Sequence, residues 1–202
     1  MKKIKILLFT ALLFSLTFAV FAAEKENNVV NVISGKDNHK SLINSKEVYI
    51  YFTFNNTLLW KDTQTVDEFL KSRKNRGDKA KEDKEVMIKD FYKKVDTMIK
   101  LLGKKWNLKR VADPKEVKSG YIIFFNYDKC FPVPGMGAEG YASISVYTSD
   151  NQTKSLIEGT VKSFSIAKTF AHYDPKFQFS ELGQRFMKEI TSFLDGKSTV
   201  YK

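Results

Sequence analysis

Residues 120–127 read GYIIFFNY and are the natural starting point, because no later stretch is so uniformly apolar. An apolar run of this length is typical of a central strand buried on both faces. Two further segments, YASISVYT (141–148) and KSLIEGTVKSFSI (154–166), lie downstream. The first alternates apolar and small polar side chains, and the turn sequence Ser-Asp-Asn at 149–151 separates the two. We therefore predict a β-hairpin beside the central strand.

Upstream of the central strand, two more segments have strand character. KEVYIYFTF (46–54) alternates cleanly between apolar and other side chains, with a period of two. NLKRV (107–111) is a shorter strand candidate that a following Asp-Pro turn ends. These segments bring the predicted sheet to four or five strands.

Two amphipathic helices are predicted between and after these strands. The first runs from Asp83 to Gly103, and the second from Ser180, a good N-cap residue, to Gly196. Each has one apolar stripe at helical spacing, formed by Met87, Phe91, Val95, Met98, Ile99 and Leu102 in the first and by Leu182, Phe186, Met187, Ile190, Phe193 and Leu194 in the second. The order of elements predicts an α+β two-layer sandwich, in which two helices pack on one mostly antiparallel sheet.

The N-terminus predicts an export signal peptide over residues 1–22. Three lysines precede an apolar run at 6–21, and small residues follow, so we expect cleavage after Ala22. That run of 16 residues would be about 24 Å long as a helix, against roughly 30 Å for a hydrocarbon core. A retained membrane anchor is the alternative. Because no cysteine follows the run, a lipid-attachment box is absent, and no later stretch is apolar enough to span a membrane. We predict a periplasmic or secreted protein.

The remaining chain divides into three parts. Residues 23–45 are polar and predict a flexible arm, although the run VVNVI within them would suit an edge strand. Residues 46–196 form the single α+β domain, and 197–202 a tail. The Lys-rich segment 71–84 has almost no apolar content, so we expect a mobile surface insertion or a solvated helix start.

Composition excludes several classes of protein. The chain has 202 residues, a net charge of +11, 43% hydrophobic and 14% aromatic residues, which excludes a fully disordered protein. Its single cysteine, Cys130, excludes a disulfide framework and a cysteine-based zinc site, and two histidines exclude a His-rich metal centre. We predict no metal and no cofactor. The basic charge, mostly lysine, reflects either composition bias or attraction to an anionic envelope surface, and export argues against a nucleic-acid partner.

No catalytic residues are predicted. Residues 135–140 read Gly-Met-Gly-Ala-Glu-Gly, which matches the dinucleotide pattern, but a strand follows where that mechanism needs a helix N-terminus. We interpret this stretch as a hairpin loop. Cys130 and His172 are a formal nucleophile and base, yet nothing in the sequence places them together. The chain is therefore predicted not to be an enzyme.

Two sets of side chains are candidates for partner binding. Phe131, Val133 and Met136 place apolar groups where a loop is normally polar, so they either form a partner-docking tip or fold back to cap the sheet. Four tyrosines fall on polar-facing strand positions, where rings can stack on bases or sugars but where ordinary sheet packing is the expectation. They are Tyr49, Tyr51, Tyr141 and Tyr147.

The order of elements resembles the small βαββα-type domains of bacterial envelope proteins. Examples are the amino-terminal domain of TolB and the periplasmic part of the curli secretion-channel lipoprotein. The matching segments are VYIYFTFNNT (48–57), KKWNLKRVADPKEVKSGYIIFF (104–125), ASISVYTSDNQTKSLIEGTV (142–161) and LGQRFMKEITSFL (182–194). The resemblance implies protein binding or envelope scaffolding without catalysis, and it supplies no functional residues. The chain departs from the lipoprotein members because it has no lipidated cysteine.

The leading hypothesis is an exported envelope binding or scaffolding module without catalytic activity, which acts through a surface loop or a sheet face. One alternative is a small periplasmic hydrolase with an unrecognised site, which would require a deep pocket with converging titratable groups. Another is a basic protein that adsorbs to anionic envelope surfaces.

Overall fold

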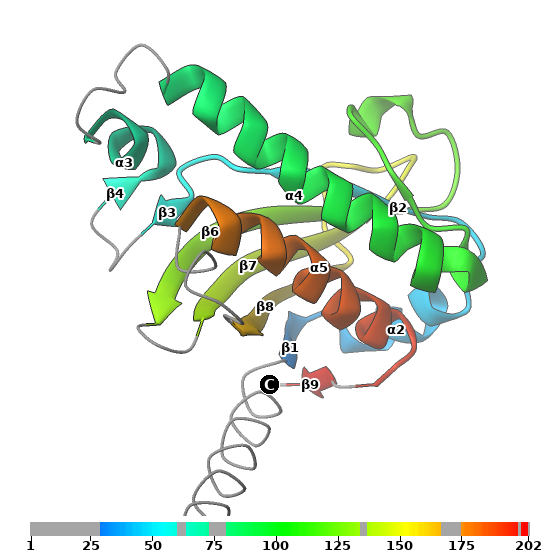
Figure 1. Ribbon diagram of the computed structural model, residues 1–202. Coiled ribbons are helices and arrows are strands. Elements are labelled where there is room, and N and C mark those ends of the chain that lie inside the picture. Colours follow the sequence, from blue (N-terminus) through cyan, green and yellow to red (C-terminus); the bar gives the residue numbers. More distant parts are fainter. Residues whose placement is uncertain are drawn as a thin grey trace, which may run out of the picture.

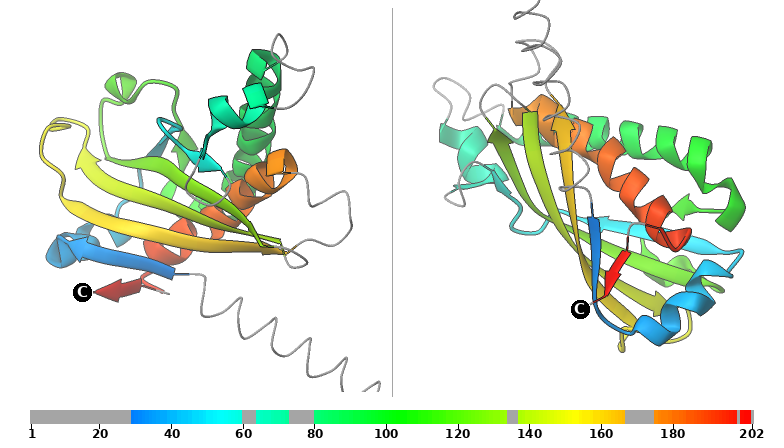
Figure 2. Two further views of the ribbon diagram at one scale, coloured as in Figure 1. Left: turned by 90° about the vertical axis from the view of Figure 1, so that its left-hand side faces the viewer. Right: turned by 90° about the horizontal axis from the view of Figure 1, so that it is seen from below.

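The computed structural model describes residues 29–59, 64–72, 80–133, 137–166, 175–197 and 199–201. The predicted signal peptide and residues 73–79 of the Lys-rich insertion lie outside these described residues. The described chain is an α+β fold in two layers, as predicted. One layer is a mixed sheet, and two long helices lie on one side of it (Figure 1, Figure 2).

Both predicted helices are present. The first, α4, begins at Ala80, so the end of the Lys-rich segment is a helix start. The second, α5, begins at Pro175, earlier than predicted, because proline suits a first helical turn. Ser180 is therefore inside α5, where its hydroxyl donates to the Phe177 carbonyl at 2.9 Å instead of capping the helix. The helices and 3₁₀ turns are α2 (Lys36–Ile43), α3 (Val66–Ser72), α4 (Ala80–Leu102), η2 (Gly103–Trp106), η3 (Pro114–Glu116) and α5 (Pro175–Leu194).

The described strands form one nine-stranded sheet, larger than the predicted four or five strands. Seven of them follow the order β4-β3-β6-β7-β8-β1-β9, while β2 pairs with β6 and β5 pairs with β2. The strands are β1 (Val29–Ser34), β2 (Val48–Thr53), β3 (Leu58–Leu59), β4 (Gln64–Thr65), β5 (Lys109–Arg110), β6 (Tyr121–Val133), β7 (Gly137–Thr148), β8 (Ile157–Ile166) and β9 (Thr199–Tyr201).

The sheet is mixed, and most of its strand pairing is antiparallel, as predicted. The predicted hairpin of β7 and β8 is antiparallel, and so are the β6–β7 and β1–β8 pairs. In contrast, β2 lies parallel to β6, and β9 lies parallel to β1. The β2–β6 pair is parallel because α3 and α4 lie between the two strands in the sequence and return the chain to the same end of the sheet.

In the residues that the structure describes, the predicted N-terminal arm and C-terminal tail are ordered parts of the fold, and the run VVNVI forms a strand, as its sequence suited. Val30 and Val32 are buried, and β1 pairs with β8 over most of its length. Helix α2 follows directly. Within the predicted tail, β9 pairs with Val30–Val32 of β1. Both ends of the domain are thus integrated into one edge of the sheet.

The predicted hairpin loop is also shorter than expected. Strand β6 continues to Val133 and β7 begins at Gly137, so residues 130–133 and 137–140 are strand rather than loop. The glycine-rich pattern has a packing reason at Gly140. A Cβ atom there would lie 2.6 Å from Phe186 Cζ of α5, so only glycine lets the helix approach the strand this closely.

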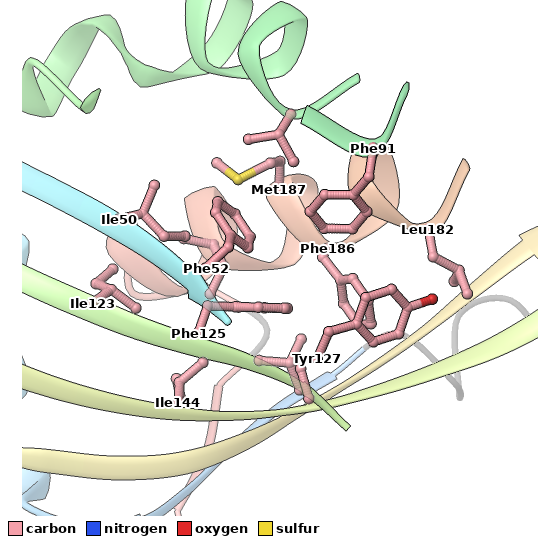
Figure 3. Close-up of a cluster of buried hydrophobic side chains, with 14 of the residues drawn as sticks. Ile50, Phe52, Phe91, Ile123, Phe125, Tyr127, Ile144, Leu182, Phe186 and Met187 are labelled. Atoms are coloured by element: carbon pink, nitrogen blue, oxygen red, sulfur yellow. The ribbon is translucent and has the colours of Figure 1, made fainter. Parts of the chain in front are cut away.

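The hydrophobic core lies between the sheet and the two long helices. Figure 3 shows Phe52, Phe125 and Tyr127 of the sheet pointing toward α4 and α5. The ring centroids of Phe52 and Phe91 lie 5.4 Å apart, and those of Phe125 and Phe186 4.9 Å. This aromatic cluster uses one face of each strand, which leaves the opposite face for other roles.

Candidate binding face of the sheet

We call the sheet surface that points away from α4 and α5 the open face. Alternation along three neighbouring strands places its side chains, and none of those named here is fully buried. Among the described residues, α4 and α5 both lie against the other face (Figure 2). The open face is formed by Tyr49, Tyr51 and Thr53 of β2, Phe124, Asn126 and Asp128 of β6, and Ser143, Ser145 and Tyr147 of β7.

Three aromatic rings form a row across the open face. Phe124 lies between Tyr51 and Tyr147, with ring centroids 5.4 Å and 4.9 Å away. Both contacts are edge-to-face, the favoured arrangement for neighbouring rings. The polar-facing positions predicted for Tyr51 and Tyr147 are thus confirmed. The prediction that the central strand is buried on both faces holds at Ile122 and Ile123 but is wrong at Phe124.

A polar network lies next to this row. Thr53 Oγ1 donates to Asn126 Oδ1 at 2.6 Å, and Asn126 Nδ2 donates to Asp128 Oδ1. Ser143 Oγ donates to the same carboxylate oxygen at 3.3 Å. Three strands therefore contribute to one hydrogen-bonded group around a single acidic side chain.

Asp128 lies on the open face by alternation with Phe124 and Asn126, and a β-bulge occurs at this point. The β6–β7 register shifts between Tyr127 and Lys129, so Lys129 comes to the same side of the sheet as Asp128. Partial burial raises the pKa of its carboxyl group, while the hydrogen bonds from Ser143 and Asn126 act in the opposite direction. No sequence signal marks this bulge, and the sequence analysis did not single out Asp128.

At one end, the open face continues into a charged and aromatic corner. Tyr141 Oη donates to Glu139 Oε2 at 2.7 Å, and Lys162 Nζ lies 3.4 Å from Glu139 Oε1. The Tyr141 ring lies 5.8 Å from Phe131, and the Lys162 ammonium 5.4 Å above the Tyr141 ring. Tyr141 thus contacts β6 through Phe131 and β8 through Lys162.

The predicted docking residues fall partly within this corner. Phe131 and Val133 are two residues apart on the same side of β6, and both are half-buried. They are strand residues rather than parts of an apolar loop tip. Met136, the third predicted residue, lies outside the described residues. The structure therefore places Phe131 beside Tyr141, and Val133 two residues further along the same strand.

The formal nucleophile of the sequence is a core residue. Cys130 is fully buried, and burial raises the pKa of its thiol to about 12, so the thiol stays protonated at neutral pH. Its formal partner, His172, lies outside the described residues. His39 is buried too, with its ring nitrogens bonded to Tyr201 and to the Phe193 carbonyl. Neither residue provides a reactive group at the surface.

In the described part of the chain, no three His, Cys, Asp or Glu side chains gather as a metal site would require. No described helix has the length and apolar character needed to cross a membrane. A groove of about 980 Å³ runs along the outer side of α4, where Arg110 forms a two-bonded ion pair with Asp96 and stacks over Tyr92. In this open groove, burial raises the pKa of Tyr92 and the hydrogen bond with Asp96 raises that of Arg110, so both side chains stay protonated at neutral pH and neither is a base.

Comparisons with known proteins show only a distant likeness of fold. No protein-family model and no curated protein matches the sequence. Among solved structures, the chain is similar to the PelC dodecamer from Paraburkholderia phytofirmans, with 8% identity, a TM-score of 0.40, and coverage of 83% of this chain and 97% of that one. A variant of the same PelC dodecamer gives 8% identity, a TM-score of 0.42, and coverage of 82% and 97%. Similarity at this level carries no function from one protein to the other.

Proposed function

We propose that this protein is an exported, non-catalytic binding module of the cell envelope, and that it holds a protein partner against its open face. The observation that carries the proposal is the row of Tyr51, Phe124 and Tyr147, three half-buried rings on the sheet face opposite α4 and α5. Aromatic rings are enriched in protein interfaces because they bury large areas at a low cost in rotamer entropy.

The polar network suits recognition as well as it suits packing. Thr53, Asn126 and Ser143 already orient the groups around Asp128 in the free protein. A partner would therefore meet a preorganised acceptor, and little side-chain ordering would remain to be done on binding. We expect the partner to place a hydrogen-bond donor opposite Asp128 and apolar groups over the ring row.

A binding role fits the geometry better than the small hydrolase that the sequence left as an alternative. A hydrolase would need two converging groups with tuned pKa values in a cleft. The pKa of Asp128 is raised, but its neighbours in the network are the neutral groups of Asn126 and Ser143. Asp128 lies on an open sheet surface, away from the groove along α4.

The envelope location rests on the sequence. The apolar leader at 1–22 supports export, and the resemblance to small envelope domains supports a scaffolding role. The likeness in fold adds nothing to these two arguments.

The proposal is tested by site-specific crosslinking in the native envelope. A photoreactive amino acid replaces Tyr51 or Tyr147 on the open face, or Lys89 on the outer side of α4 as the matched control. We expect the two open-face positions to form the same discrete adduct with one protein, and the control position not to form it. Adding Phe124→Ser should abolish the adduct, because it removes the middle ring of the row.

Two results would contradict the proposal. One is an adduct that forms equally from position 89. The other is an adduct that persists at full yield with Phe124→Ser, provided that the variant unfolds at the same temperature as the wild type.

A further inference from the structure

Three helices end together at one end of the molecule. Trp106 Nε1 of η2, directly after α4, donates to the Ile43 carbonyl at the end of α2 at 3.3 Å. Lys105 Nζ lies 2.6 Å from Asp195 Oδ1, which directly follows α5. Figures 1 and 2 both show the ends of α4 and α5 close to α2. We call this region the helix-end surface, and its exposed members are Lys40, Lys46, Lys100, Leu101, Leu102, Lys104, Lys105 and Lys197.

Two adjacent leucines on the helix-end surface are exposed. Leu101 is 66% exposed and Leu102 41%, although Leu102 was predicted to belong to the buried stripe of α4. The reason lies at Gly103, where a Cβ atom would stand 2.8 Å from Leu108 Cβ. The chain turns there and Leu108, which is buried, takes the place against the helix. The two leucines therefore lie at the margin of the core, and Leu101 lines a groove of about 430 Å³ together with Met98 and Phe177.

Lysines cluster at the three helix ends of this surface. Lys100, Lys104 and Lys105 lie within one turn of the two leucines along the chain, and Lys40, Lys46 and Lys197 come from the other two helix ends. The acidic residue in contact with this group is Asp195, which pairs with both Lys105 and Lys197, the latter at 3.2 Å. Glu47 is turned toward Ser119, whose hydroxyl donates to it. Lysines outnumber the acidic side chains here several-fold.

Helix geometry explains part of this arrangement but not all of it. Lysines near helix C-termini interact favourably with the backbone carbonyls, so their presence alone has a structural reason. Exposed leucines have no such reason, and a soluble phosphate or an anionic polymer would not require them. Exposed apolar side chains beside a cluster of lysines are the pattern of surfaces that enter the boundary between lipid headgroups and acyl chains.

We propose that the helix-end surface docks the protein onto a lipid bilayer that contains anionic headgroups. Leu101 and Leu102 enter the acyl boundary, and the lysines of this surface lie at the level of the lipid phosphates. This inference is separate from the proposed function, because the open face contains none of these residues.

The test measures sedimentation with phosphatidylglycerol vesicles and with phosphatidylcholine vesicles. One variant carries Leu101→Ser with Leu102→Ser, and another Lys100→Gln with Lys104→Gln. The matched controls lie at the other end of α4: Val86→Ser, which changes a residue that is 50% exposed, and Lys81→Gln with Lys89→Gln. Because every variant has the same N-terminus, differences between them report on the changed positions alone.

We expect the wild type to prefer phosphatidylglycerol vesicles, and high salt to weaken that binding. Both helix-end variants should bind these vesicles on the order of tenfold more weakly, while both controls bind as the wild type does. Equal binding to both vesicle types would overturn the proposal, and so would a leucine variant that binds like the wild type. A leucine variant that instead changes the sedimentation of the protein without vesicles would also overturn it, in favour of a contact between protein molecules.

Discussion

His39 connects three elements through one buried ring. Its Nε2 donates to the Phe193 carbonyl of α5 at 2.9 Å, so its Nδ1 must accept the hydroxyl proton of Tyr201 from β9. The ring also stacks on Phe193 with centroids 4.2 Å apart, and the Lys36 ammonium lies 4.9 Å from the centroid of the Tyr201 ring. This bonding pattern requires the neutral imidazole, because one nitrogen donates and the other accepts.

We expect the protein to lose stability as the pH falls below about 6.5. Burial lowers the pKa of His39, while the Phe193 hydrogen bond acts in the opposite direction. The unfolded chain therefore takes up a proton at a pH where the folded protein does not, and the free energy of unfolding falls across that window. Urea unfolding of the wild type and of His39→Gln measures this. A His39→Gln variant with the same slope against pH would assign the effect to another group.

Asp128 makes the stability of the protein depend on pH in the opposite direction. Because burial raises its pKa, stability that is present while the carboxyl is protonated is lost as the pH rises through its folded-state pKa. Asp128→Asn keeps an acceptor for Ser143 and removes the charge. We expect this variant to have a higher melting temperature than the wild type at neutral pH, and a smaller difference below about pH 4.

Asp150→Asn is the control for Asp128. The hydrogen bond with Thr148 lowers the pKa of this exposed carboxyl group, so the substitution should not raise the melting temperature at neutral pH. An Asp128→Asn variant that melts below the wild type at neutral pH would show that the charge itself holds the network together.

Among the helices and strands, the sequence predicts those that form because of a local periodic pattern. The apolar stripe that includes Phe91 and Val95 is enough to predict α4, because a buried helix face needs that spacing. Strand β9 has three residues and exists only because Val30–Val32 offers a parallel edge. Its pairing joins the two ends of the chain, and no local pattern contains such a partner.

On the open face, too, local sequence patterns predict the positions of some residues and not of others. Alternation in β2 places Tyr51 correctly, because one face of that strand is buried and the other is not. The place of Phe124 on the open face was not predicted, because a uniformly apolar run does not show which face of the sheet each residue occupies. Asp128 was missed because the apolar run, and with it the predicted strand, ends at Tyr127, whereas β6 continues to Val133.

The contact between α5 and β7 depends on Gly140. A Cβ atom there would meet Phe186 Cζ at 2.6 Å and Leu182 Cδ2 at 2.9 Å, so Gly140→Ala must push the helix away from the strand. We expect a loss of about 1–3 kcal/mol in the free energy of unfolding, the usual cost of overpacking. Chemical denaturation measures it. Ser145→Ala, on the open face of the same strand, is the control and should change stability by less than about 0.5 kcal/mol. Equal effects of the two substitutions would contradict the packing role of Gly140.

For the whole molecule, the placement of both long helices on one side of the sheet separates stability from binding. The rings of Phe52, Phe125 and Tyr127 lie between the layers (Figure 3), and Tyr127 stacks on Phe179 with ring centroids 4.5 Å apart. The open face and the helix-end surface can therefore change without altering the core. That separation holds only if sheet and helices fold as one unit.

A substitution at Phe91 tests whether the helices and the sheet unfold as one cooperative unit. The Phe91 ring lies within 5.2–5.6 Å of Phe54, Tyr127 and Phe179, so it links α4 to the sheet and to α5. We expect Phe91→Ala to lower the free energy of unfolding by about 3–5 kcal/mol, as large-to-small substitutions of buried aromatic residues do. Helix signal by far-UV circular dichroism and aromatic packing by near-UV circular dichroism should still be lost at one denaturant concentration. Val86→Ala, exposed on the same helix, should leave that midpoint almost unchanged. If the two signals separate in Phe91→Ala, the helices and the sheet are two cooperative units, and substitutions on the open face would then also disturb the packing beneath it.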